Sequence, residues 1–235
     1  MYDEPMRTSI NFGNRFYLSG ITAQESLGGI GDQTRMALDI LDTRLAEAGT
    51  DRTSLLTVHI WLRDMTLFQE MTAVWNDWIE TYNPPSRSCV SGGSLQQEAL
   101  IEIVATASIP GLEEDNTSIE RFGIVQGEGR PTICLGLAFK DWFTVCTLAS
   151  DCSEDIIGQT KQVLRDFDTF LAEAGTDKSK ILTMDIWLKR VSDSAAVNDV
   201  LMSWLVSDQL PSSSCVRADM ARPEMLIEIR ITASR

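Results

Sequence analysis

The chain contains two copies of one sequence, and this duplication constrains its architecture more than any other feature. The segment LAEAGTD, which begins at Leu45, recurs unchanged from Leu171, an offset of 171 − 45 = 126 residues. The repeat predicts two similar structural units joined end to end. The same offset pairs residues along most of both copies: Trp61 with Trp187, Trp78 with Trp204, Pro85 with Pro211, Cys89 with Cys215, and Glu102 with Glu228.

One charged position differs between the copies. Arg87 in the first copy aligns with Ser213 in the second. A charged residue that is kept in one copy only indicates that the copies no longer do the same job. We therefore predict a first domain at 1–109 that carries the site, a linker at 110–118 rich in Pro, Gly and acidic residues, and a degenerate second domain at 119–235.

The charge balance and the apolar pattern bear on partners and location. The 235 residues include 34 acidic and 20 basic side chains, a net charge of −14, which disfavours binding to a phosphate backbone. No apolar run approaches the roughly 20 residues that span a membrane. The five cysteines form no CxxC pair, and the first residues do not resemble a secretory leader. We expect a cytoplasmic protein without a nucleic-acid or membrane partner.

Strand and helix patterns alternate in the same order in both copies. In the first copy we predict a strand at 15–24, a helix at 32–48, a strand at 54–62 and a helix capped by Asp64. An extended segment that begins at Arg87 and a last strand at 99–109 follow. The second copy is expected to contain a helix at 155–174, a strand at 180–188, a helix at 193–207 and a strand at 225–233. Each unit is thus predicted to be α+β, a mixed sheet with two helices packed on one face.

The other face of each sheet needs a cover. The strand face that bears Leu100, Glu102 and Val104 is too apolar to lie in water. We therefore expect the two units to associate with each other, or several chains to associate.

Arg87 and Glu102 are the two candidate catalytic residues. Glu102 interrupts the apolar strand LIEIV, where a carboxylate is costly to bury unless it has a partner or a task. Arg87 follows Pro85-Ser86 at the start of a strand, and a guanidinium group binds a carboxylate through two parallel hydrogen bonds. The pair suits a small anionic substrate, with the arginine on its carboxylate and the glutamate handling a proton or water. A structural ion pair between them is the alternative.

Three further residues, Glu228, His59 and Cys89, are candidates for roles in the site. Glu228 is retained although Ser213 replaces the arginine, so we interpret it as structural, bonded to backbone amides or to Arg217 or Arg222. The single histidine, His59, excludes a His-rich metal site, and its strand position favours a structural role. Cys89 lies on the same side of its strand as Arg87, and without an adjacent base it fits a packed thiol better than a nucleophile.

These residues carry a resemblance to a known family. PPSRSCV at 84–90, followed by Glu102 in LIEI, resembles the signature of the RidA family of reactive-intermediate (enamine/imine) deaminases, also called the YjgF or L-PSP endoribonuclease-like family. The segment from Ala46 to Trp78 resembles its helix–strand–helix region. The resemblance covers about 100 residues in each copy.

The resemblance implies a fold, an activity and roles for residues. It implies a chorismate-mutase-like fold in which three units pack their sheets into a barrel with clefts between neighbours. It implies that Arg87 binds the substrate carboxylate, that backbone groups around Cys89 hold the imine, and that Glu102 positions the hydrolytic water. The products would be a 2-keto acid and ammonia, with no metal or organic cofactor. Three two-unit chains would supply six units, so we predict a homotrimer.

The sequence departs from the family pattern in ways that keep other functions open. It lacks the family's GPYS-like N-terminal segment, so no role is carried over to Tyr17. A protein that binds a small carboxylate without turnover is therefore the alternative to a deaminase. Ribonuclease activity, implied by the family's other name, is disfavoured by the net charge of −14 and by the absence of paired histidines.

Overall fold

The computed structural model describes residues 8–23, 28–79, 83–92, 98–109 and 118–235. Unit one contains β1 (Ser9–Phe12), β2 (Arg15–Ile21), α1 (Ile30–Glu47), β3 (Leu55–Leu62), α2 (Phe68–Trp78), β4 (Ser86–Ser91) and β5 (Ile101–Ser108). Unit two contains β6 (Glu120–Val125), β7 (Ile133–Phe139), β8 (Trp142–Leu148), α3 (Ile156–Glu173), β9 (Ile181–Leu188), α4 (Ser194–Trp204), β10 (Ser212–Arg217) and β11 (Ile227–Ser234).

This architecture confirms the predicted fold class. Both units combine a mixed sheet with two helices, and the predicted helices and strands lie within a few residues of those observed. Asp64 caps as expected, but it caps the short 3₁₀ turn that precedes α2, where its side chain accepts from the Thr66 amide. The strands β1 and β6 are not indicated by the sequence pattern, because both are short and largely exposed. The predicted linker falls almost wholly outside the described residues.

The repeated LAEAGTD segment has the same local task in each unit. Gly49 and Gly175 adopt φ of +76° and +74°, the left-handed conformation that ends a helix and favours glycine. The next hydroxyl, Thr50 or Thr176, donates to the last strand of its unit, at Ser108 O (2.7 Å) or Ser234 O (2.6 Å). The following aspartate caps the 3₁₀ turn that begins the next strand. The segment therefore ties the end of a helix to the sheet.

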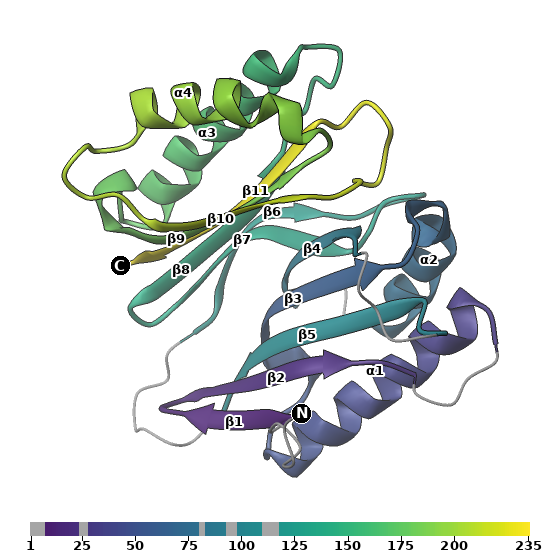
Figure 1. Cartoon of the computed structure of the whole chain (residues 1–235). Coiled ribbons are helices and arrows are strands. Elements are labelled where there is room, and N and C mark those ends of the chain that lie inside the picture. Colours follow the sequence, from purple (N-terminus) through teal and green to yellow (C-terminus); the bar gives the residue numbers. More distant parts are fainter. Residues whose placement is uncertain (1–7, 24–27, 80–82, 93–97, 110–117) are drawn as a thin grey trace, which may run out of the picture.

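All strands belong to one continuous sheet. The order is β1-β2-β5-β3-β4-β7-β8-β11-β9-β10, with β6 paired to the other edge of β7. The units join where β4 meets β7 in a parallel pair with Ser86 beside Cys134. The helices lie on the two outer sides of the molecule, α1 and α2 on one and α3 and α4 on the other, with the strands between them (Figure 1). The expected association of the two units is thus present within one chain.

Apolar side chains from both units bury this junction. Leu56, just inside β3, is fully buried against Cys134, Leu137 and Phe139 of β7. A second cluster joins Val90 of β4 to Cys146, Trp187 and other residues of unit two. Each unit also has its own core between sheet and helices. None of the helices among the described residues is long and apolar enough to cross a membrane.

Candidate active site

The candidate site lies at the seam, by which we mean β4 of unit one where it runs past β7, β8 and β11 of unit two. Ser86 and Cys134 are the one residue pair by which β4 and β7 join as neighbouring strands among the described residues. The end of β4 is held instead by the β10–β11 connection, where the Ser91 amide donates to Asp219 O (2.8 Å) and the Asp219 amide to Ser91 Oγ (2.7 Å). The edge of β4 between these two contacts therefore faces side chains of unit two.

Arg87 is held in this seam with its guanidinium against aromatic rings. Its Cζ atom lies 5.1 Å from the ring centroid of Trp75 and 5.8 Å from that of Phe68, both on α2. The residue is only 4% exposed, and burial lowers the pKa of Arg87. Neither Nε nor Nη1 has a hydrogen-bond partner among the described residues. Buried N–H groups of a charged arginine are costly to leave unpaired, so they suit an anionic ligand.

The carboxylate beside Arg87 comes from unit two. Glu228 on β11 is buried, and its charge acts on Arg87. Its Oε1 accepts from the Cys146 thiol at 3.3 Å, and the carboxylate also accepts from the Cys89 backbone amide. Burial raises the pKa of Glu228 to about 7, against the opposing effects of Cys146, Arg230, Arg87 and the Cys89 amide. A carboxyl group with this pKa exchanges protons readily near neutral pH.

The structure does not bring Glu102 to Arg87. Arg87 lies beside Val58, and Val58 lies opposite Ala105, so these three share the face that packs against the helices. Glu102 is three residues from Ala105 and therefore points to the other face. There its carboxylate lies over Gly20, where any Cβ would collide with it. The structure therefore does not show the predicted pair of Arg87 and Glu102, and the carboxylate whose charge acts on Arg87 is that of Glu228.

Glu228 is the site residue that sequence reasoning missed. The interpretation that backbone amides bind it is right, but the Cys89 amide belongs to the other copy. Arg217 and Arg222, the arginines considered as its partners, instead form ion pairs with Asp219 and Glu224. The available signal was the duplication itself, because a junction between repeated units brings side chains of one copy next to those of the other.

The remaining candidates lie around this centre. Burial raises the pKa of Cys89 to about 12, so it is a thiol at neutral pH, and its backbone amide donates to Glu228. His59 is buried, with its Nδ1 hydrogen-bonded to Ser88 Oγ. Within the described part of the chain, no group of three His, Cys, Asp or Glu side chains is arranged to hold a metal ion.

Comparisons with known proteins identify the family of this chain. The model of the family described as Endoribonuclease L-PSP matches residues 4–109 and 147–235, most of both units. The chain belongs to this family. A RutC family protein of Haemophilus ducreyi is 35% identical over 85 residues, covering 36% of this chain and 73% of that protein. The RutC family protein YoaB of Escherichia coli K12 is 34% identical over 80 residues, covering 34% of this chain and 70% of that protein.

A solved structure shares the arrangement of both units. A chorismatase crystal structure matches 96% of this chain and 76% of its own with a TM-score of 0.72. At 12% sequence identity this likeness concerns the fold alone. Because the match spans both units, it supports the predicted fold of two tandem units.

Proposed function

We propose that the chain hydrolyses small imine or enamine acids, such as 2-aminoacrylate-like compounds, to 2-keto acids and ammonia at the seam. One observation carries the proposal: at the seam, a buried arginine of unit one, with two nitrogen atoms that lack partners among the described residues, lies within electrostatic range of a unit-two carboxyl group whose pKa is about 7. The first group fits the carboxylate of such a substrate, and the second fits the proton transfers of its hydrolysis.

The steps follow from this arrangement. Arg87 binds the substrate carboxylate, while the Cys89 amide holds the Glu228 carboxylate next to the imine. Glu228 orients a water molecule, takes one of its protons as the oxygen adds to the imine carbon, and passes that proton to the imine nitrogen, which gives a carbinolamine. Glu228 then takes the proton of the carbinolamine hydroxyl and delivers it to nitrogen as the C–N bond breaks, so that a carbonyl forms and ammonia leaves. Water and imine are thereby converted to carbonyl and ammonia, and Glu228 ends as it began.

The test is hydrolysis of 2-iminopropionate made in place by an amino-acid oxidase. Faster release of pyruvate with the wild-type chain than without it is expected. A chain that gives no acceleration, but whose melting temperature rises with 2-keto acids, would instead be a carboxylate-binding protein without turnover. RNA cleavage is disfavoured by the net charge of −14.

We also propose that the chain self-associates through the edge that unit two leaves open. All six residues of β10 are exposed, whereas their counterparts in β4 are almost all buried by unit two. Leu182 is 52% exposed, and its counterpart Leu56 is fully buried. Because both units of one chain share a single sheet, a ring of three units would take its third from another chain. The predicted homotrimer is one such assembly.

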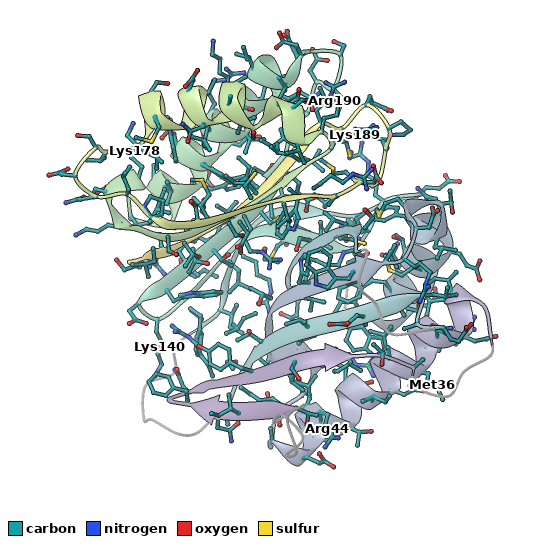
Figure 2. All side chains as sticks on the ribbon, in the orientation of Figure 1. Met36, Arg44, Lys140, Lys178, Lys189 and Arg190 are labelled. Atoms are coloured by element: carbon teal, nitrogen blue, oxygen red, sulfur yellow. The ribbon has the colours of Figure 1, made fainter. Side chains whose placement is uncertain are left out.

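A surface-charge variant tests this association. Val216 in β10 is 45% exposed, and we expect light scattering to give a multimer for the wild-type chain and a lower mass for Val216→Asp. The control is Met36→Asp, because Met36 is similarly exposed but lies on α1, on the outer side of unit one (Figure 2). A wild-type monomer at all concentrations, or an equal effect of both substitutions, would contradict the proposal.

A further inference from the structure

Arg230 connects unit two to the strand that carries the site in unit one. It lies on β11 two residues after Glu228, so both side chains leave the same face. Its Nη2 atom donates to Ser88 Oγ at 2.6 Å and to Val58 O at 3.3 Å. Ser88 stands between Arg87 and Cys89. Unit two is therefore hydrogen-bonded to β4 at the residue between Arg87 and Cys89.

The Ser88 hydroxyl connects Arg230 to His59. Because the guanidinium of Arg230 can only donate, Ser88 Oγ accepts from it and also shares a hydrogen bond with His59 Nδ1. His59 is a neutral ring at neutral pH. Burial first, and Arg230 second, hold the pKa of His59 well below its usual value. The ring is enclosed by Trp61, with centroids 4.2 Å apart, and by Trp187, at 5.1 Å.

The charge of Arg230 consequently has no counter-ion from unit one. Its side-chain partner there, the Ser88 hydroxyl, and the adjacent His59 are uncharged, and within the described residues Arg230 belongs to no ion pair. Glu228 is the carboxylate whose ionisation Arg230 favours. The groups that act on Glu228 are Cys146 on β8, Arg230 on its own strand, and Arg87 with the Cys89 amide on β4.

The duplicated positions show that the residues around Arg230 are found together at the seam and are not repeated elsewhere in the described residues. With the offset of 126, Arg230 corresponds to Val104, and His59 corresponds to Asp185. In unit two the equivalent serine, Ser214, donates to Asp185 Oδ1 at 2.8 Å on the exposed edge. Arg87, His59 and Arg230 thus occur together at the seam. At the equivalent position in the opposite copy, each is replaced by a different residue.

We propose that Arg230 is a positioning residue for Arg87 and Glu228, which fixes β4 between Arg87 and Cys89 and places a positive charge on the strand face that bears Glu228. This inference rests on the proposed function for its kinetic consequences. Removal of the guanidinium leaves burial less opposed, so Glu228 takes up a proton at higher pH. Glu228 must be ionised to accept a proton from water. In a variant without the guanidinium, activity is therefore lost on acidification at a higher pH than in the wild type.

The test compares four variants by the pH dependence of kcat/KM for imine hydrolysis. With Arg230→Met, the acid limb is expected to move up by about one pH unit, as for loss of one nearby charge. Arg230→Lys should return the limb toward its wild-type position but keep a raised KM, since an ammonium group does not reproduce the guanidinium contacts. Ser88→Ala should raise KM with the limb unmoved. The control Arg15→Met removes another arginine that joins the units, through Asp141 at 3.1 Å, and should leave the limb in place.

A second measurement separates this inference from the proposed reaction. The infrared carbonyl band of protonated Glu228, assigned by its loss in Glu228→Gln, can be titrated without any substrate. Its midpoint is expected to lie near pH 7 in the wild-type chain and higher in Arg230→Met, whether or not the chain turns over imines. A midpoint that is equal in the wild type, Arg230→Met and Arg15→Met would overturn the inference even in an active enzyme.

Discussion

Replacement of Arg87 by methionine is expected to lower kcat/KM for imine-acid hydrolysis by roughly 30-fold to several-thousand-fold, the equivalent of about 2–5 kcal/mol for a desolvated charge pair. The guanidinium lies against Trp75 with two N–H-bearing atoms unpartnered among the described residues, so a substrate carboxylate would complete its hydrogen bonding. Methionine keeps the packing against the ring and removes only the charge and the donors. Pyruvate release from 2-iminopropionate is the readout.

Two controls make this result specific. Ser213→Ala alters the corresponding position of the other copy, which is exposed, and should leave kcat/KM at the wild-type value. Near-ultraviolet circular dichroism and the melting temperature of Arg87→Met establish that the seam is intact. A correctly folded Arg87→Met chain with wild-type kinetics would exclude carboxylate binding by Arg87.

The difference between the copies has a physical explanation in their surroundings. Arg87 is buried because unit two covers β4, and in that dry setting a charged hydrogen bond is strong. Ser213 lies on β10, which is exposed along its length. An arginine there would be solvated and screened, so it would gain much less from a carboxylate ligand. Within a single chain, the copy without the arginine is therefore also the copy whose equivalent strand has no covering unit.

The fold was predictable because its determinants are local. LAEAGTD contains a helix end, a left-handed glycine and a capping aspartate, and its recurrence 126 residues later carries the same structure to the second unit. Strand β6 has no counterpart in the described part of unit one and no clear apolar alternation, so nothing local indicates it.

The site was predictable only in part, because its glutamate is chosen by how the units meet. Arg87 was identified from its place in PPSRSCV, and the structure leaves it with unsatisfied donors, as a ligand-binding arginine requires. Glu102 and Glu228 occupy equivalent positions in LIEI, so local sequence does not distinguish them. The strand register places Glu102 on the opposite face from Arg87, and the β4–β7 junction brings Glu228 to it.

Glutamine at position 228 is expected to reduce kcat by roughly 10²- to 10⁴-fold, the range for loss of a general acid–base group. Glutamine keeps the size and hydrogen-bonding capacity of the side chain but does not accept a proton from water. Glu102→Gln, the equivalent change in the other copy, should stay within about twofold of the wild type, because Glu102 lies on the other face of its sheet. The reverse ranking of the two variants would return the catalytic role to Glu102.

Glu228→Gln is expected to lower kcat but to raise stability, and the gain in stability depends on pH. Burial raises the pKa of Glu228 from an unfolded value near 4.5 to about 7, so folding favours the protonated form. The stabilising contribution of this group is complete below about pH 4.5 and is lost as pH rises through 7. That loss amounts to on the order of 3 kcal/mol above pH 8, at 1.36 kcal/mol for each pKa unit. Glu228→Gln, uncharged throughout, should therefore gain in melting temperature over the wild type between pH 5 and pH 8. An equal difference at both pH values would show that Glu228 is not a buried group with a raised pKa, and its proposed role in proton transfer would fail with it.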